Sequence, residues 1–364
     1  MRAEFLKSFD TPSLMAEWTQ LYESAAPNFF LSPPFLSAWL EAAQAGSRIF
    51  AVRVTGDDGE TRALGLAGTP AKASILHPSE VRLIETGRAR FDRLYVEYAD
   101  FLMADENDGA ARDAALDALL AGTTASADLV FRNARPALAA ACERAAARHK
   151  LDLIVLRQQP TFQIDLGNGV AGDVTSGFSA SVRAKIRRSL RGYAPRGPVR
   201  FEAMRSASAR TEAFEEMMAL HTAYWNARGE PGAFADADLN AFHRGLIERA
   251  PEAADLLRLT AGGDTIAILY NLAAAGRAYN YQSGIRFDAE NQVSPGFLAH
   301  AFAADHYRKA GFRIYDLMAG EAEYKRRLGV ERETLTSIVL ERRGARQTVR
   351  SLVRRFRNAR TRQT

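Results

Sequence analysis

The sequence contains little cysteine and no long apolar run, and both shortages narrow what the protein can be. Cys142 is the single cysteine among 364 residues, so no disulfide can form within the chain and we expect a reducing compartment. No apolar stretch approaches the roughly 18–20 residues that a membrane span needs. The N-terminal stretch "MRAEFLKSFDTPSL" lacks the apolar centre of a signal peptide. We therefore expect a cytoplasmic protein.

Metal-binding patterns are also lacking. The six histidines show no metal-ligand spacing, and we therefore expect no metal site. Hydrophobic residues make up 47% of the chain and charged residues 25%, which is ordinary for a globular protein. The length is sufficient for two domains, each with a core of its own.

Positive charge is concentrated at the C-terminus. Residues 341–364 hold nine arginines and one glutamate, a net +8, so the preceding 340 residues carry −3 of the formal +5 of the chain. Val349, Leu352, Val353 and Phe356 recur at helical spacing, which predicts a basic amphipathic helix. This tail could dock on the body, bind an acidic partner or remain disordered. We favour reversible attachment to an anionic inner-membrane surface.

Hairpin and helix patterns occur in both halves of the chain. The first half has a hairpin around the turn at 55–60, a strand-like run at 95–103, and helices expected at 108–121 and 135–149. The second half has three strands joined by tight turns, and the middle one is apolar on both faces, as a central strand requires. This order predicts an α/β protein with an N-terminal domain (1–160), a C-terminal domain (161–340) and the basic tail (341–364).

The third of these strands, "YNYQSG", carries polar and aromatic side chains. Strict alternation would place Tyr279, Tyr281 and Ser283 on one face and Asn280 and Gln282 on the other. Buried polar groups need hydrogen-bond partners. Neighbouring loops could supply these partners, and so could a bound ligand.

A helix, a short strand and a second helix follow. Ser294 can cap the first helix, with Pro295 at its first position. The strand stops beside Asp316, at the rim of the sheet where ligands commonly bind. After a glycine turn, the second helix opens with the sequence Glu-Tyr-Lys. An internal ion pair between Asp316 and Lys325 is the alternative to a functional role for this cluster.

Two further features are candidates for substrate binding. Residues 183–200 carry seven cations and no acid, on a predicted helix that contains Arg187 and Arg188. The helix presents either a solvated face or a wall for the phosphates of a nucleotide sugar, a lipid phosphate, a tRNA or coenzyme A. Trp225 stands near Arg228 at the end of another predicted helix, where it belongs either to the core or to the wall of a binding cleft.

Together, "HTAYWNARG", "YNYQSG" and the "YD…G…YK" pattern that ends at Lys325 resemble the CelD/BcsL-like acetyltransferases, a FemAB-related branch of the GNAT superfamily. The resemblance covers about residues 157–330. It implies an α/β (α+β) fold made of two tandem GNAT-like domains, each with a mixed, largely antiparallel sheet flanked by helices.

The resemblance also implies a reaction: transfer of an acyl group, typically acetyl, from acetyl-CoA or another acyl-CoA to an amino group of a sugar or exopolysaccharide precursor. A carboxylate could serve as general base, and a tyrosine could donate to the tetrahedral oxyanion or protonate the leaving thiolate. The catalytic candidates are Asp316, Glu323, Tyr324 and Lys325. The donor-binding candidates are Tyr281, Gln282, Ser283, Ser294 and Gly296. The substrate-binding candidates are Trp225, Arg228, Arg187 and Arg188.

The sequence departs from the superfamily at the pyrophosphate loop. The usual Arg/Gln-x-x-Gly-x-Gly/Ala motif is replaced by "IRFDAENQVSPGFLA", in which Gly296 is a partial substitute. Aminoacyl-tRNA, the donor of FemAB relatives, therefore stays open, and no other nucleic acid partner is expected. A third alternative is a catalytically inactive scaffold or ligand sensor in a polysaccharide synthesis machine.

Overall fold

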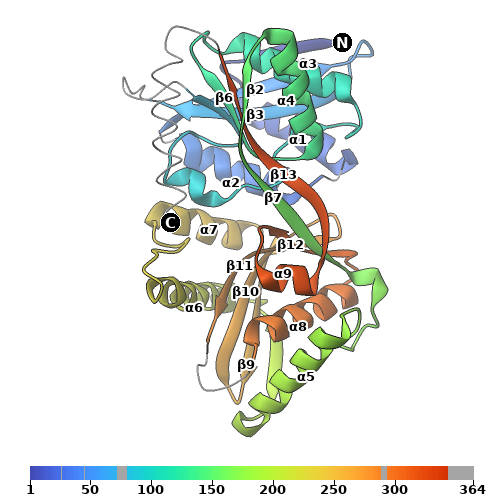
Figure 1. The fold of residues 1–364 in the computed structure, drawn as a ribbon. Coiled ribbons are helices and arrows are strands. Elements are labelled where there is room, and N and C mark those ends of the chain that lie inside the picture. Colours follow the sequence, from blue (N-terminus) through green and yellow to red (C-terminus); the bar gives the residue numbers. More distant parts are fainter. Residues whose placement is uncertain (26, 45, 72–79, 288–292, 343–364) are drawn as a thin grey trace.

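The computed structural model describes residues 1–25, 27–44, 46–71, 80–287 and 293–342 (Figure 1). Its strands form a thirteen-stranded mixed sheet in the order β1-β2-β3-β4-β6-β13-β7-β12-β11-β10-β9-β8, and β5 pairs with β3 beside this path. The strands are β1 (Arg2–Leu6), β2 (Ser47–Thr55), β3 (Thr61–Pro70), β4 (Glu80–Leu83), β5 (Leu102–Met103), β6 (Asp128–Ala134), β7 (Asp152–Asp165), β8 (Val199–Ala203), β9 (Ala254–Ala261), β10 (Asp264–Ala274), β11 (Arg277–Ile285), β12 (Ile314–Ala319) and β13 (Val330–Glu341).

Helices flank both parts of this sheet. Polar side chains fix several of their starts: Asp108, Ser179, Ser206 and Asp236 each accept a hydrogen bond from a backbone N–H in the first turn of the helix that follows. The α-helices are α1 (Thr11–Ala25), α2 (Pro33–Gln44), α3 (Gly109–Gly122), α4 (Pro136–His149), α5 (Ala180–Tyr193), α6 (Ala207–Asn226), α7 (Ala237–Arg249), α8 (Pro295–Lys309) and α9 (Glu323–Leu328).

Each half of the chain contains one parallel strand pair crossed over by a helix. In the first half β4 and β6 are parallel and α3 lies between them in sequence. In the second half β11 and β12 are parallel and α8 lies between them. The remaining neighbours along the main path of the sheet pair antiparallel. The predicted α/β fold, a mixed sheet flanked by helices, is confirmed.

Two long strands, β7 and β13, join the halves (Figure 1). β13 pairs with β6 on one side and with β7 on the other, and β7 also pairs with β12. The predicted boundary at 160 falls within β7, and β13 contacts both halves. The division into 1–160 and 161–340 therefore stays a prediction, and the predicted tail helix lies outside the described residues, which end at 342.

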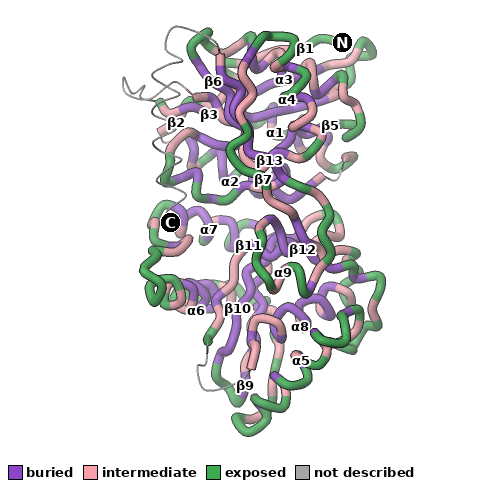
Figure 2. The backbone as a smooth tube through the Cα atoms, in the orientation of Figure 1, coloured by how far each residue is buried: buried purple, intermediate pink, exposed green. Residues whose placement is uncertain are grey.

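The core occupies both faces of the second-half strands, and Figure 2 shows these strands as largely buried. On one face, side chains such as Tyr270 and Tyr281 pack with α6, α7 and the N-terminal half. On the other face, side chains such as Leu269 pack with α5 and α8. None of the described helices is long and apolar enough to cross a membrane.

Most predicted elements of the second half are confirmed, and one strand of the first half is wrong. Of the run at 95–103, only Leu102 and Met103 form a strand. Tyr95 and Tyr98 have positive φ angles of 46° and 56°, which lie outside the β region of a regular strand. The segment therefore turns away from the sheet and contacts the other half of the chain.

Candidate functional site

The site is centred on the point where the parallel pairing of β11 and β12 ends. The two strands pair at Arg277–Tyr279 and Ile314–Asp316. Beyond these residues β12 continues along β7 and β11 continues along β10. In the described part of the chain, the remainder of β11 therefore has no strand partner on the β12 side.

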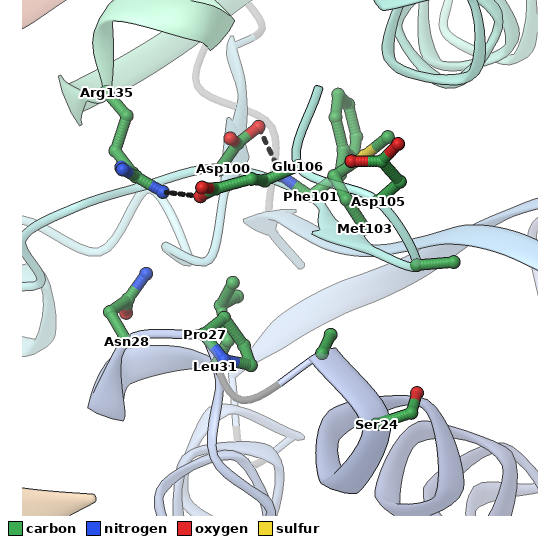
Figure 3. Close-up of a pocket in the computed structure, with 12 residues that line it drawn as sticks. Ser24, Pro27, Asn28, Leu31, Asp100, Phe101, Met103, Asp105, Glu106 and Arg135 are labelled. Atoms are coloured by element: carbon green, nitrogen blue, oxygen red, sulfur yellow. Dashed lines mark hydrogen bonds and ion pairs between the residues drawn. The ribbon is translucent and has the colours of Figure 1, made fainter. Parts of the chain in front are cut away.

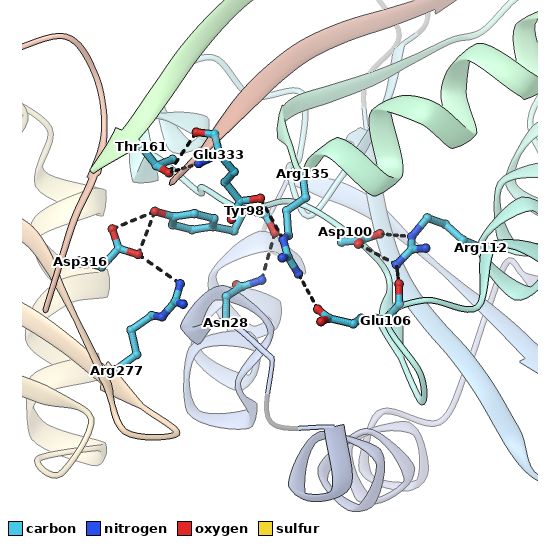
Figure 4. Close-up of polar contacts among 10 residues, drawn as sticks. All are labelled: Asn28, Tyr98, Asp100, Glu106, Arg112, Arg135, Thr161, Arg277, Asp316 and Glu333. Atoms are coloured by element: carbon cyan, nitrogen blue, oxygen red, sulfur yellow. Dashed lines mark hydrogen bonds and ion pairs between the residues drawn. The ribbon is translucent and has the colours of Figure 1, made fainter. Parts of the chain in front are cut away.

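The N-terminal half reaches this point through residues 94–98. The Tyr281 hydroxyl donates to the Leu94 carbonyl. The Ala319 N–H donates to the Glu97 carboxylate at 2.8 Å. The Tyr98 hydroxyl donates to Asp316, at 2.9 and 3.0 Å from its two oxygens (Figure 4). The segment is thus anchored to both β11 and β12, and its left-handed residues are the kind of local strain that functional sites hold.

Asp316 is enclosed by its partners. It is 2% exposed and accepts from Tyr98, from the Met318 N–H at 2.7 Å and from the Arg277 guanidinium at 3.3 Å. Burial raises the pKa of Asp316 to about 6, while the Arg277 charge opposes the rise. Its ion pair is with Arg277, so the alternative of an Asp316–Lys325 ion pair is wrong. These contacts leave Asp316 better placed to hold Tyr98 than to reach a substrate.

Glu97 is a second carboxylate at this point of the sheet. It is half-buried, and burial raises its pKa to about 7 although the Lys325 charge opposes the rise. Lys325 Nζ donates to the Ala319 carbonyl at 2.5 Å. Ala319 therefore contacts both side chains: its N–H donates to Glu97, and its carbonyl accepts from Lys325. Burial lowers the pKa of Lys325, whereas Glu97 and Asp316 raise it. The result is a glutamate poised near neutral pH beside a cation.

Tyr324 lies beside this pair on α9. Its ring stacks on that of His300, with 5.3 Å between centroids and 6° between planes. Burial and the Glu97 charge raise the pKa of Tyr324 to about 12, so the hydroxyl keeps its proton at neutral pH. Glu323 is different: its side chain is 83% exposed and pairs with Arg327 at 3.3 Å. Glu323 is the first residue of α9, where an acid interacts favourably with the helix dipole.

The predicted donor-binding strand is irregular. β11 carries a bulge at Tyr281, because the consecutive residues Tyr270 and Asn271 of β10 pair with Gln282 and Asn280. Ser283 therefore leaves the predicted face of Tyr279 and Tyr281 and exchanges hydrogen bonds with Asn280, at 3.3 and 3.4 Å. The alternation expected for this strand is wrong because the bulge interrupts it. Tyr281 is buried and Gln282 lies beside His221 of α6.

The start of α8 is lined by cations. Ser294 occupies the cap position, but its side chain makes no capping hydrogen bond, so the predicted side-chain cap is wrong. Its N–H instead donates to Ser189 Oγ of α5 at 3.0 Å. Lys185 Nζ and the Arg327 guanidinium lie 4.1 and 5.6 Å from the Phe297 ring centre. Two positive charges therefore flank the free amides of this first turn, an arrangement that suits phosphate groups.

The other substrate candidates lie on α5 and α6. Arg187 and Arg188 are exposed. Trp225 is 37% exposed, so it belongs to the surface and not to the core. Arg228 lies just beyond the end of α6, and its guanidinium is 3.5 Å from the ring centre of Tyr224 in the last turn of that helix.

A cavity of about 370 Å³ lies in the N-terminal half (Figure 3). Its wall includes Arg135, which pairs with Glu106 at 3.2 Å. Asn28 also lines it and donates to the Tyr98 carbonyl at 3.0 Å. Tyr98 thus links the cavity wall to Asp316, because its carbonyl accepts from Asn28 and its hydroxyl donates to Asp316 (Figure 4). No group of His, Cys, Asp or Glu side chains in the described ranges is placed to hold a metal ion.

The structure brings Asp316, Tyr324 and Lys325 together and adds residues that sequence reasoning missed: Glu97, Tyr98 and Arg277. Glu97 and Tyr98 lie in the run at 95–103, which the sequence predicts to be a strand and not part of a site. The available signal was a glutamate between two tyrosines in a stretch with weak alternation, which is too common a pattern to single out a site.

Comparisons with known proteins agree with this geometry. Residues 180–326, which run from α5 into α9, match the acetyltransferase (GNAT) domain family. FemX has a similar structure, with 11% identity, a TM-score of 0.64, and coverage of 96% of this chain and 100% of that chain. L-PGS from Bacillus licheniformis is also similar, with 13% identity, a TM-score of 0.53, and coverage of 96% of this chain and 98% of that chain. A tandem GNAT protein from the clavulanic acid biosynthesis pathway has 13% identity, a TM-score of 0.51, and coverage of 94% of this chain and 100% of that chain.

These likenesses show the fold and support an acyltransferase. At such identities the solved structures show the fold, which is that of tandem GNAT proteins. The domain match covers α8 and the parallel strands β11 and β12, and it supports an acyltransferase. No curated protein sequence matches the chain.

Proposed function

We propose that this protein transfers an acyl group from acyl-CoA to an amino group of a sugar or cell-envelope polysaccharide precursor. The observation that carries the proposal is the end of β11–β12 pairing beside Glu97 and Lys325. A thioester placed along the free edge of β11 would meet a proton acceptor and a cation at one point. The amino-sugar class of acceptor rests on the resemblance described above.

The donor fits the start of α8. Among the described residues, a Cβ added at Gly296 would meet only Ile285, 3.9 Å away, so this part of the structure leaves room for a ligand beside the first turn. Lys185 and Arg327 would balance the pyrophosphate charge, together with the free amides of the turn. These contacts would replace the glycine-rich loop that the sequence lacks.

The chemistry then follows from the placement of side chains. The acceptor nitrogen attacks the thioester carbonyl carbon, and Glu97 takes the proton that the nitrogen loses. Lys325 stabilises the oxyanion as the tetrahedral intermediate forms. The carbon–sulfur bond breaks, and Tyr324 supplies a proton to the thiolate. Asp316 is a positioning residue in this scheme, because it holds Tyr98 and through it the segment that carries Glu97.

A second candidate donor, aminoacyl-tRNA, is favoured by one feature. The exposed cations of α5, including Arg187, Arg188 and Arg191, extend along a helix of 14 residues, roughly 21 Å at 1.5 Å per residue. Such a row is longer than a single pyrophosphate and would suit a polynucleotide backbone. Attachment of the basic tail to the inner membrane, close to lipid-linked precursors, belongs to the same proposal.

Thermal denaturation with acetyl-CoA tests the donor. A ligand at one hundred times its Kd stabilises the folded state by about 2.7 kcal/mol, which corresponds to a rise of a few degrees in Tm. The Gly296→Glu variant should keep the Tm of the free protein and lose the shift, because a carboxylate would repel the pyrophosphate. A flat response to acetyl-CoA together with a response to aminoacyl-tRNA would move the assignment to the second candidate.

A further inference from the structure

An aromatic surface lies where α6 ends and β11 gives way to the following loop. The Phe287 ring packs on Tyr224, with 4.8 Å between ring centres and 32° between planes. The Arg228 guanidinium also lies against Tyr224, 3.5 Å from the ring centre. Phe287 is nevertheless 62% exposed, which is unusual for a residue of its size. Trp225 adjoins this group, and we refer to Tyr224, Trp225, Arg228 and Phe287 as the aromatic platform.

The platform is held rigidly. Trp225 Nε1 donates to His221 Nε2 at 3.0 Å, which fixes the indole although the side chain is partly exposed. The Tyr224 and Trp225 rings meet edge to face, at 90° and 5.5 Å. Rings that are fixed before a ligand arrives lose little conformational entropy on binding. The surface is therefore suited to stacking against a flat ligand.

The platform and the start of α8 flank the same strand end. Gly284 of β11 packs so closely on α6 that an added Cβ would lie 2.6 Å from the Met217 carbonyl oxygen. The next residue, Ile285, faces Gly296 at the start of α8. Phe287 follows two residues later, which an extended chain covers in about 7 Å. A ligand with phosphates at α8 would thus carry its neighbouring groups within reach of the platform.

We propose that the aromatic platform stacks on the adenine ring of the acyl donor. This inference rests on the proposed function, because both candidate donors carry adenosine: coenzyme A in its nucleotide and aminoacyl-tRNA at its 3′ end. Aromatic rings and arginine planes stack on bases without reading their sequence. A sugar ring of the acceptor would also fit an aromatic surface, but Phe287 follows two residues after Ile285, which faces Gly296 at the predicted phosphate site of the donor.

Binding measurements on the full-length protein test this inference. The probes are coenzyme A, 4′-phosphopantetheine, which lacks the nucleotide, and the trinucleotide CCA as the end of tRNA. Phe287→Ala and Trp225→Ala should each weaken binding of the adenosine-containing probe at least about tenfold, or about 1.4 kcal/mol. Affinity for 4′-phosphopantetheine should stay unchanged. Phe287→Tyr should restore binding, and Val170→Ala, a control at another exposed apolar residue, should have no effect.

The outcomes separate the two proposals. If neither coenzyme A nor CCA binds the wild-type protein, the proposed function fails and the platform assignment fails with it. If one of them binds and the platform variants bind it equally well, only the platform assignment is overturned. An altered KM for an amino-sugar acceptor, with donor affinity unchanged, would likewise overturn it in favour of an acceptor site. Whichever adenosine probe binds identifies the source of the donor.

Discussion

Replacing Glu97 by glutamine should remove the proton acceptor while keeping its structural contact. The glutamine Oε1 can still accept from the Ala319 N–H, so we expect a change in unfolding free energy of less than about 1 kcal/mol. Loss of a general base typically costs a factor of about 10² to 10⁴, which equals about 3–5 kcal/mol of transition-state stabilisation. The assay is kcat/KM for acyl transfer to an amine, measured between pH 5.5 and 9, a range chosen at roughly the pKa value plus or minus two.

The pH profile makes this test specific. A base must be ionised to accept a proton, and burial places the pKa of Glu97 at about 7. Wild-type kcat/KM should therefore fall tenfold per unit below about pH 7, and Glu97→Gln should lose that limb. Glu85→Gln is the matched control, because burial also raises the pKa of Glu85 to about 7 while its partners are Arg82 and Arg132. A low-pH limb that persists in Glu97→Gln would refute the assignment.

Two further predictions concern the cluster and the core. Asp316→Asn and Tyr98→Phe should each lower kcat/KM and be non-additive, with a coupling of about 0.5–3 kcal/mol in a double-mutant cycle, because both act on the same hydrogen bond: Tyr98→Phe removes its donor, and Asp316→Asn removes the charge of its acceptor. Additive losses would count against a positioning role. Phe30 lies in η1 (Phe29–Leu31) and is fully buried against Phe35, Tyr279 and Tyr281. Its replacement by alanine should lower the free energy of unfolding by about 3–5 kcal/mol, measured by denaturant unfolding. A loss below about 1 kcal/mol would contradict its placement between the two halves.

The elements around the site could be predicted because their signals are local. Proline at the start of α8, helical periodicity through it and Gly311 after it are all read within 17 residues of sequence. Asp316 could be found because it lies within a short apolar strand followed by a glycine turn. The basic character of α5 was likewise visible in the residue order.

The partners of those residues could not be predicted. Tyr98 lies 218 positions before Asp316, and no local pattern links them. The left-handed conformations of Tyr95 and Tyr98 depend on contacts with β11 and β12, which override the strand-forming tendency of the sequence. The same limit applies to Ser283, since its face is set by a bulge opposite β10 and not by alternation within β11.

The pairing of β13 with β6 and β7 has a consequence for synthesis of the chain. As the polypeptide leaves the ribosome, β6 and β7 emerge long before β13, which spans Val330–Glu341 near the C-terminus. Until then each has an unsatisfied row of amides and carbonyls along one edge, open to pairing with another nascent chain. Contacts of such long sequence separation also form slowly. The described sheet thus reaches its strand order only when β13 has emerged, and a chain that stopped before Val330 would leave the facing edges of β6 and β7 unpaired.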